Sequence, residues 1–237
     1  YILKRILLAI VTIWAVATLT FFLMNMVPGG PFLSEKAISP QATAALEAKY
    51  GLDKPLWQQY LTYMAGASHG DFGDSLKQRG RTVMDIITMK FPVSARVGGV
   101  SVLVALLLGV PLGCIAALKR GKFLDNLISV VSTCGIAVPS FVICTLLLYF
   151  FGVRLQILPT MGLTSWKHYV MPVMALAFYP TAYIMRLMRS SMLDVLGQDY
   201  MRTAKAKGLA GGKILFKHAL RNAILPVITY VGPLLAY

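Results

Sequence analysis

The feature that most constrains this sequence is a long run of residues without charge. Residues 6–27 contain no Asp, Glu, Lys or Arg, and as a helix they extend about 33 Å, enough to cross the hydrocarbon core of a bilayer. The chain of 237 residues is 57% hydrophobic and only 14% charged, whereas soluble domains are about 25% charged. Such a chain cannot bury its apolar surface in a core of its own and keep a wettable exterior. The sequence therefore predicts an all-α polytopic membrane protein.

Four further apolar segments follow the first one. The predicted spans are residues 6–27, 93–118, 124–151, 169–187 and a last, shorter segment, 222–237. Because proline removes a helix hydrogen bond and clashes with the preceding turn, Pro139 predicts a kink or break in the third span. The last segment has about 16 of the roughly 20 residues that a crossing needs. Since no Met begins the chain either, we expect at least one further span in the full protein.

The distribution of basic residues predicts which ends of the spans face the cytoplasm. The chain has 23 Lys and Arg against 9 Asp and Glu. If the N-terminus is inside, the inside segments 1–5, 119–125 and 186–221 together hold 13 basic and 3 acidic residues. The outside loop 28–92 is almost neutral, with 7 basic and 6 acidic residues. Because cytoplasmic loops are enriched in Lys and Arg, we expect a cytoplasmic N-terminus.

The chain thus divides into three parts: an N-terminal tail with the first span (1–27), an extracytoplasmic loop (28–92) and a membrane core (93–237). The loop is patterned like a small helical module rather than a linker. Two roles for the module remain open, since it is either a cap that shields the spans or a docking surface for an extracytoplasmic partner.

Three helices are expected in this loop. A serine-proline pair and Gly51 are typical of the two ends of a helix over 40–50. A second helix is expected over 53–67, and a third over 82–90, ending before Pro92 because the residue that precedes a proline disfavours helix. The apolar side of the second helix is formed by Leu56, Trp57, Tyr60, Leu61 and Met64.

The residue types that carry catalysis or metal binding are not arranged for either. The three histidines are far apart, with no H-E-x-x-H, and the three cysteines lie in apolar spans without C-x-x-C spacing, where we expect them to be buried. Gly212-Lys213 is similar to the end of a phosphate-binding loop, but Ile214 follows, and Lys207 stands where the first glycine belongs. We therefore expect no catalytic residue, cofactor or metal in this chain. Intramembrane acidic or Lys residues of a proton-driven pump are missing as well, so energy for any transport would come from another subunit.

The inside loop, residues 188–221, carries the most specific pattern. Asp199 is placed to N-cap a two-turn helix, and Gly208 is placed to end it in the left-handed conformation. Met201 and Ala204 share one face of this helix with Tyr200, and alanine permits close approach of a partner. The pattern predicts a short helix that docks on another protein, followed by a second helix from about Lys213 to Asn222.

Two alternative roles for this basic loop remain open. It could hold the topology or contact anionic membrane lipid, at about 1 kcal/mol per charge. It could also bind nucleic acid, but basic nucleic-acid surfaces are interleaved with aromatic side chains, and this loop has no such interleaving and is tethered between spans. We therefore expect lipid contact and no nucleic-acid partner.

The order of motifs along the chain resembles one transporter family. Residues 202–209 (Arg-Thr-Ala-Lys-Ala-Lys-Gly-Leu), followed by 218–222 and Leu225-Pro226, are similar to the cytoplasmic coupling motif of ATP-binding-cassette (ABC) importer permeases. The general motif begins with an acidic residue where Arg202 stands, and its interval from Gly208 to the proline is shorter; both departures are those of the peptide/nickel branch. The chain also resembles the B-type oligopeptide permease subunits at residues 27–32, 50–52, 69–73, 91–95, 138–141 and 158–159.

The resemblance implies a fold, an assembly and a cargo. The fold is a type I ABC importer transmembrane domain, with about five of six expected transmembrane helices covered and a helical extracytoplasmic insertion after the first. The chain would form half of a pore in the bacterial cell (inner) membrane, as a heterodimer with a homologous second permease subunit. Two cytoplasmic ATP-binding subunits, which would hydrolyse the ATP, and an extracytoplasmic peptide-binding protein would complete the assembly, so the chain itself is not expected to be an enzyme. The implied cargo is oligopeptides. Dipeptides, nickel chelates or glutathione remain alternatives, as does a channel that is not coupled to ATP.

The resemblance also implies which residues act. By this resemblance, the residues that couple the chain to the ATPase are Tyr200, Arg202, Thr203, Ala204, Lys205, Ala206, Lys207, Gly208 and Leu209. For the translocation pathway, Pro139-Ser140 and Tyr179-Pro180 place kinks and polar atoms at mid-membrane depth, where a discontinuous helix can line a cavity. Irregular helix packing accounts for these two pairs equally well.

Overall fold

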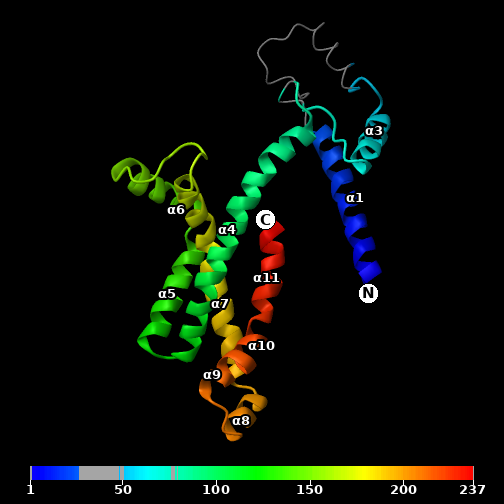
Figure 1. The fold of residues 1–237 in the computed structure, drawn as a ribbon. Helices are drawn as coiled ribbons and strands as arrows, with labels where there is room; N and C mark the ends of the chain where they lie inside the picture. Colours follow the sequence, from blue (N-terminus) through cyan, green and yellow to red (C-terminus); the bar gives the residue numbers. More distant parts are fainter. Residues whose placement is uncertain (1, 27–47, 49–50, 76–77, 79, 237) are drawn as a thin grey trace. The chain divides into compact units, whose positions relative to one another are not determined.

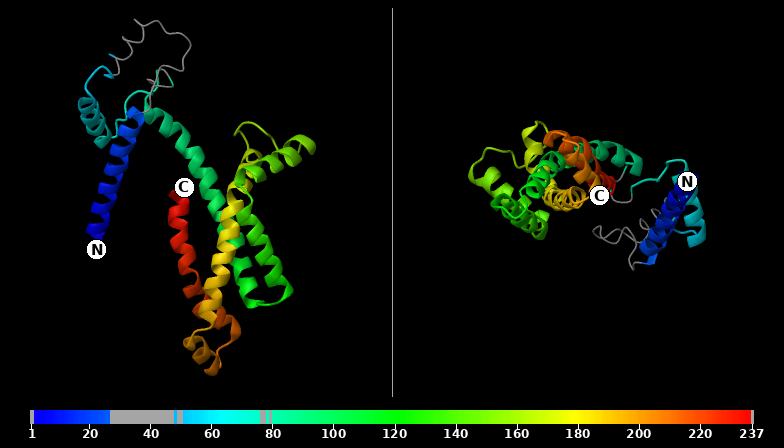
Figure 2. Two further views of the ribbon diagram at one scale, coloured as in Figure 1. Left: turned by 180° about the vertical axis from the view of Figure 1, so that it is seen from behind. Right: turned by 90° about the horizontal axis from the view of Figure 1, so that it is seen from below.

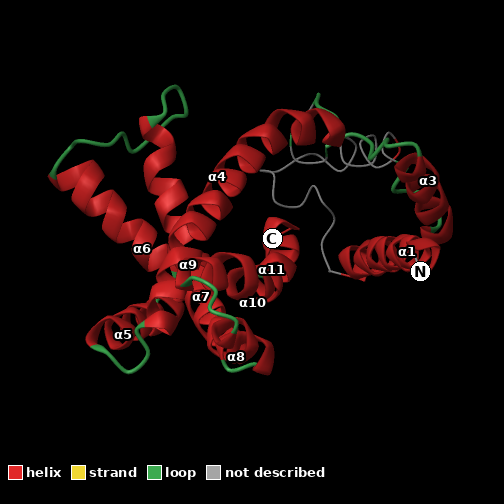
Figure 3. Ribbon diagram, turned by 60° about the horizontal axis from the view of Figure 1, so that its bottom comes forward, coloured by secondary structure: helices red, strands yellow, loops and turns green. Residues whose placement is uncertain are grey.

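The computed structural model describes residues 2–26, 48, 51–75, 78 and 80–236. The regular elements in these ranges are all helices (Figure 3), and the one isolated strand bridge among them joins Asp74 to Thr82. The predicted all-α class is therefore confirmed. The helix expected over 40–50 and the motif at 27–32 lie outside the described residues. The chain forms two compact units, Tyr1–Pro92 and Val93–Tyr237, and each is described by itself.

Several helices are long and apolar enough to cross a membrane (Figure 1). The single helices of this kind are α1 (Ile2–Met26), α4 (Val83–Leu118) and α7 (Lys167–Leu196). Two bent pairs also qualify: Phe123–Ala137 with Ser140–Arg154, and Gly211–Ala223 with Leu225–Ala236. The described part of the chain thus contains 3 candidate spans, or up to 5 if each bent pair is one span.

In the first unit, α3 (Leu56–Ser68) packs on the last turns of α1. The hydroxyl groups of Thr18 and Tyr60 lie 2.8 Å apart, and the rings of Phe21 and Tyr63 stack with centroids at 5.8 Å. The helix begins at Leu56 rather than at residue 53, because Pro55 holds an extended backbone conformation before it. Its expected apolar side is only partly covered, since Leu56, Trp57 and Leu61 are exposed. No residue of α1 is buried, so nearly its whole apolar surface is available to lipid.

The third helix expected in the loop is the beginning of α4. The backbone N–H of Asp85 donates to the Thr82 hydroxyl, and the N–H of Thr82 donates to the Asp85 carboxylate, both at 3.1 Å. This reciprocal capping box satisfies two N–H groups at the helix start. The expected end before Phe91-Pro92 is wrong, because α4 continues to Leu118. A proline is tolerated in an apolar helix when neighbouring groups satisfy the freed carbonyl.

In the second unit, α4 and α7 run side by side (Figure 2), and a stripe of small residues on α4 lets the two helices approach closely. A Cβ atom at Gly109 would lie 2.7 Å from Ile184 Cγ2, and one at Gly113 would lie 2.6 Å from the Met185 carbonyl oxygen. Such spacing brings helix backbones together where lipid supplies no hydrophobic driving force between helices. The stripe recurs at every fourth position and is buried at Ser101, Ala105, Gly109, Gly113 and Ala117.

The third predicted span is broken. Helix α5 (Phe123–Ala137) ends before Pro139, and α6 (Ser140–Leu147) with the π-helical segment η1 (Leu148–Arg154) follows at an angle of 98°. The break expected at Pro139 is therefore present. Both α5 and α6 contact α7, and α5 approaches it closely, since a Cβ atom at Gly135 would lie 2.6 Å from Ala182 Cβ.

Helix α7 is continuous through Pro172 and Pro180. The interruption considered at Tyr179-Pro180 is therefore absent, and α7 also includes residues 188–196, which were expected in the inside loop. After α7 the chain forms α8 (Asp199–Ala206), then α9 (Gly211–Lys213), the π-helical segment η2 (Ile214–Leu220), α10 (Arg221–Ala223) and finally α11 (Leu225–Ala236).

Candidate functional site

The residues predicted to couple the chain to a partner lie on and directly after α8. This helix follows Gln198, whose side chain makes no capping hydrogen bond. The prediction that Asp199 caps the helix is wrong, because Asp199 is the first helical residue rather than the one before it. Its carboxylate lies 3.6 Å from the Arg202 guanidinium instead, and both side chains are largely exposed. An exposed pair of this kind contributes little to stability.

Gly208 ends the helix in the way its position suggested. Its φ is +72°, which a residue with a side chain adopts only with strain. The N–H of Gly208 donates to the Lys205 carbonyl at 3.0 Å, and the N–H of Leu209 donates to the Ala204 carbonyl at 3.4 Å. These two bonds form a Schellman motif. The predicted left-handed end at Gly208 is therefore confirmed.

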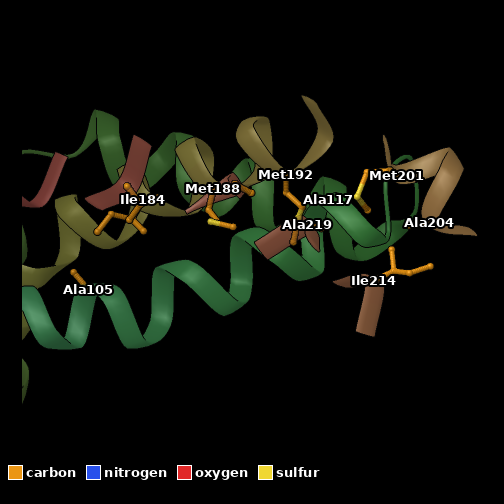
Figure 4. Close-up of a cluster of buried hydrophobic side chains, with 11 residues drawn as sticks. Ala105, Ala117, Ile184, Met188, Met192, Met201, Ala204, Ile214 and Ala219 are labelled. Atoms are coloured by element: carbon orange, nitrogen blue, oxygen red, sulfur yellow. The ribbon is translucent and has the colours of Figure 1, made fainter. Parts of the chain in front are cut away.

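The apolar face of α8 points into the chain's own core. Met201 is 1% exposed and Ala204 is 7% exposed. Figure 4 shows both at one end of a buried cluster that also contains Met192 of α7, Ala117 of α4 and Ile214 of η2. The expectation that Met201 and Ala204 form a docking face is therefore wrong. Three residues apart on a helix, they share one side, and that side is already occupied.

The opposite face of α8 is open. Arg202 and Thr203 are exposed on it, Lys205 is exposed at one edge, and Tyr200 at the other edge accepts a hydrogen bond from Asn222 Nδ2 at 3.0 Å. The exposed residues of the predicted coupling set are Tyr200, Arg202, Thr203, Lys205, Ala206, Lys207 and Gly208.

A hollow of about 470 Å³ adjoins this face. Its lining includes Lys205 and Leu209, Leu118 at the end of α4, and Leu215 of η2. The predicted coupling residues thus divide into a buried residue, Ala204, an exposed basic face, and Leu209, which is half-buried at the rim of the hollow.

The predicted pathway residues occupy two separate places. Pro139 and Ser140 lie exposed at the break between α5 and α6. Pro180 is buried within α7, whereas Tyr179 is 41% exposed. The Tyr179 ring stacks on that of Tyr183, four residues later, with centroids at 6.3 Å.

The tyrosine pair on α7 extends to α11. The ring of Tyr183 lies 4.5 Å from that of Tyr230, measured between centroids. Sequence reasoning missed Tyr183 and Tyr230. The spacing of four between Tyr179 and Tyr183 places them on one side of a helix and was the available signal, but nothing in the sequence pairs them with α11.

A second missed feature is an ion pair between α5 and α7. Asp125 accepts hydrogen bonds from Arg189 through Nε at 2.5 Å and Nη2 at 2.8 Å, and from the Gly121 N–H at 2.9 Å. The Asp125 side chain is 3% exposed. Because the partners are 64 positions apart, no local pattern predicts the pair.

The described residues offer no arrangement for metal chemistry. Within these ranges, His, Cys, Asp and Glu side chains do not gather in groups of three or more that could hold an ion. The cysteines were expected to be buried, but only Cys114 is half-buried, and Cys134 and Cys144 are exposed on the isolated chain. Gly135, next to Cys134, is packed closely against Ala182 of α7.

Comparison with known proteins decides the family. Residues 109–237 match the model of the binding-protein-dependent transport system inner membrane component, and residues 1–98 match the model of the N-terminal part of such membrane components. The chain belongs to this family. As a binding-protein-dependent transport component, it is a multi-pass integral membrane protein that works with partner ATPase and binding-protein subunits.

Relatives of this transport component are similar over nearly its whole length. It is 46% identical to the dipeptide transport system permease protein DppB of Bacillus subtilis, covering 100% of this chain and 77% of that protein. It is 42% identical to the oligopeptide transport system permease protein OppB of Salmonella typhimurium, covering 98% of this chain and 77% of that protein. The family resemblance stated from the motifs is thereby confirmed.

Proposed function

We propose that this chain is the permease subunit of an ABC importer for peptides and that the exposed face of α8 docks on a cytoplasmic ATPase. The similarity to permeases named for dipeptides and for oligopeptides supports peptides as the cargo class. The observation that carries the docking role is the division of α8 into a buried side, Met201 and Ala204, and an exposed basic side.

The anchored side accounts for how a short helix can transmit motion. Met201 packs in the same buried cluster as Met188 and Met192 of α7, so a displacement of α8 carries the end of α7 with it. Switching between access states by rigid-body rotation requires this kind of firm joint between the docked element and the span. A loose loop in the same place would absorb the displacement.

The exposed side defines the chemistry of the partner. Arg202, Lys205 and Lys207 are exposed, and the last two lie at the helix C-terminus, where the helix dipole favours positive charge. The complementary surface on the ATPase is therefore a groove with acidic side chains or free carbonyl oxygens. Charge complementarity of this kind sets orientation and association rate more than affinity.

The remaining assembly follows from the same proposal. The N-terminus and α8 face the cytoplasm of a bacterial cell whose inner membrane holds the chain, and the excess of Lys and Arg in residues 1–5, 119–125 and 186–221 supports this orientation. A homologous second permease subunit completes the pore as a heterodimer, two ATP-binding subunits supply the energy, and an extracytoplasmic protein delivers the peptide. The chain itself catalyses no reaction and holds no cofactor.

Charge reversal on α8 tests the docking role. The double variant Arg202→Glu/Lys205→Glu, assembled with its partner subunits in proteoliposomes, should lose peptide-stimulated ATP hydrolysis and uptake. Arg120→Glu, an exposed reversal on the turn between α4 and α5, is the matched control and should keep both activities. Peptide-stimulated hydrolysis that is unchanged in the α8 variant contradicts the proposal. Uptake that continues without ATP would identify a channel instead.

Oligopeptides are our first choice of cargo, and dipeptides are the second because a dipeptide permease is the 46% identical relative. Uptake of a labelled pentapeptide in competition with unlabelled dipeptide separates the two. Nickel chelates and glutathione serve as further competitors. Either one would be supported as the cargo only if it inhibits uptake of the labelled peptide.

A further inference from the structure

One side-chain hydrogen bond joins α8 to α10, the short helix that leads into α11 (Figure 1). Asn222 Nδ2 donates to the Tyr200 hydroxyl at 3.0 Å, across 22 positions of the chain. In the described part of the chain, the other side-chain hydrogen bonds and ion pairs of α8 stay within that helix, from the Thr203 hydroxyl to the Asp199 carbonyl and between Arg202 and Asp199. The Asn222 amide is therefore the polar group that ties α8 to another element.

The side chain of Asn222 is held from a second side as well. Its Nδ2 also donates to the His218 carbonyl of η2 at 3.3 Å. Because a carbonyl oxygen only accepts hydrogen bonds, the nitrogen end of the amide must face His218, and the same nitrogen then meets Tyr200 as a donor. The Tyr200 oxygen accepts, and its own hydrogen stays available to a partner, since the side chains of Tyr200 and Asn222 are both exposed.

The bond lies where it controls the rotation of α8 about its axis. Met201 and Ala204 hold the buried side of the helix through apolar contacts, and such contacts have no preferred direction. Tyr200 lies at the edge of the exposed face, about 100° around the axis from Met201. Because a hydrogen bond is directional, one at this edge resists a turn of the helix that the apolar contacts tolerate.

Asn222 also connects α8 to the last candidate span. It is the central residue of α10, and α11 begins at Leu225. On the inner side of these helices, Ala223 and Val227 are fully buried in the cluster that contains Met201. A movement of α8 thus reaches α11 as well as α7, and the bond to Asn222 transmits its rotation.

We propose that Asn222 is a positioning residue of the coupling site. Through its hydrogen bond to Tyr200 it sets the rotation of α8, and thereby the direction in which Arg202 faces the ATPase. This role rests on the proposed docking of α8 and deepens it, since Asn222 is the residue that orients the docked helix. The predicted coupling residues all lie between positions 200 and 209, so Asn222 is an addition to them.

Coupling in the assembled transporter tests the proposal. In proteoliposomes, Asn222→Ala and Tyr200→Phe should each reduce the stimulation of ATP hydrolysis by peptide about fivefold, the change expected for the loss of one ordinary hydrogen bond. Because both variants remove the same bond, the double variant should be no worse than either single one. Losses that multiply in the double variant would overturn the proposal, since the two side chains would then act separately.

Gln198→Ala is the matched control. Gln198 has an exposed side-chain amide next to α8, and its Nε2 donates to the Asp194 carbonyl four positions earlier, as Asn222 does to the His218 carbonyl. In the described part of the chain, the Gln198 side chain makes no second bond to another element. The control should keep full peptide stimulation, and a loss equal to that of Asn222→Ala would overturn the proposal. Asn222→Gln, which keeps the amide on a longer side chain, should recover part of the stimulation.

The rotation of α8 is measured on the full chain in detergent, without the ATPase. Spin labels are attached through Thr203→Cys on α8 and Arg120→Cys on the turn between α4 and α5, after the native cysteines have been replaced by alanine. The distribution of distances between the labels, measured by pulsed electron paramagnetic resonance, should broaden or shift in Asn222→Ala and in Tyr200→Phe. It should stay as in the parent in Gln198→Ala. A distribution that is unchanged in Asn222→Ala would overturn the proposal.

The docking of α8 and the positioning role of Asn222 fail in different ways. If Arg202→Glu/Lys205→Glu keeps its peptide stimulation, α8 does not dock on the ATPase, and the role of Asn222 falls with it. If this charge reversal abolishes the stimulation while Asn222→Ala keeps both the stimulation and the label distances of the parent, the docking stands and only the positioning role is wrong. Each variant should unfold close to the temperature of the parent, which excludes misfolding as the cause of a loss.

Discussion

Arg189 of α7 holds Asp125 of α5 through two hydrogen bonds, from Nε at 2.5 Å and from Nη2 at 2.8 Å. The burial of the two partners is unequal, since the Asp125 side chain is 3% exposed and the Arg189 side chain is 31% exposed. Removing Arg189 therefore has a different effect on stability from removing Asp125. A carboxylate left behind stays buried, whereas a guanidinium left behind can reach water.

We expect Arg189→Gln to destabilise the chain more than Asp125→Asn does. The first leaves a buried carboxylate with only neutral donors and should cost about 3 kcal/mol, and the second should cost about 1–2 kcal/mol. Denaturation of the purified subunit in detergent measures both. The double variant should cost less than the sum of the single changes, and strict additivity would show that the two side chains do not interact.

Gly113→Ala should destabilise the packing of α4 on α7. The new Cβ would lie 2.6 Å from the Met185 carbonyl oxygen and from Met188 Cβ, and a backbone atom cannot move aside cheaply. Overpacking of this kind costs about 1–3 kcal/mol. Gly99→Ala on the same helix is the control, because no atom lies within 4 Å of its new Cβ and alanine favours helix by about 1 kcal/mol. Thermal unfolding should rank the Gly99 variant at or above the parent and the Gly113 variant below it.

Gly208→Ala should weaken coupling through the backbone alone. No atom lies within 4 Å of the new Cβ, but φ is +72°, so the change strains the Schellman end of α8 by about 1 kcal/mol. In Gly212→Ala the new Cβ also has no atom within 4 Å, and the φ of Gly212 is not positive, so this variant should leave ATP hydrolysis unchanged. Peptide-stimulated ATP hydrolysis in proteoliposomes gives the comparison, and equal activity of the two variants would refute a role for the helix end. Gly208→Asn should be intermediate, since asparagine tolerates this conformation better than alanine does.

Met201→Ala should loosen α8 from the core. Met201 is 1% exposed, and truncating a buried methionine costs about 2–5 kcal/mol. Because α8 carries Arg202 and Lys205, limited trypsin digestion reports the release directly as faster cleavage within the helix. Thr203→Ala, an exposed neighbour, should leave the cleavage rate unchanged. If Met201→Ala is cleaved no faster than Thr203→Ala, the buried side does not anchor the helix.

The sequence predicted best what depends on local chemistry. The apolar runs predicted helices of membrane-crossing length, Pro139 predicted a break, and Gly208 predicted a left-handed helix end. Each of these follows from the properties of one residue or one segment, whatever lies around it. The family also followed from the motifs, because their residue types and order are properties of the sequence itself.

The sequence predicted less well what depends on the neighbours of a segment. Pro92 and Pro180 would end helices in water, but α4 and α7 run through them, because apolar helices retain their structure around a proline when adjacent groups satisfy the backbone. The side of α8 on which a partner can dock was misjudged for a related reason. Met201 and Ala204 have the size and polarity of an interface, and only the position of η2 and α7 shows that the chain itself covers them.

Long-range pairs had no local signal. Asp125 with Arg189 and Tyr183 with Tyr230 come from segments that only the fold brings together. The stripe from Ser101 to Ala117 is different, since its small residues at every fourth position were visible in the sequence and would have predicted the face of α4 that meets another helix.

The buried methionines at the base of α7 have a mechanical consequence. Met188, Met192 and Met201 lie there in one buried cluster with Ala204 and Ala219, and the branched Ile214 belongs to the same cluster. Methionine is unbranched and polarizable and refills irregular space after a shift, while alanine offers no bulk to obstruct one. Helix α8 therefore has room for a slight shift against α7 as Met201 packs again, while the branched Ile214 in the same cluster limits how far the helix turns.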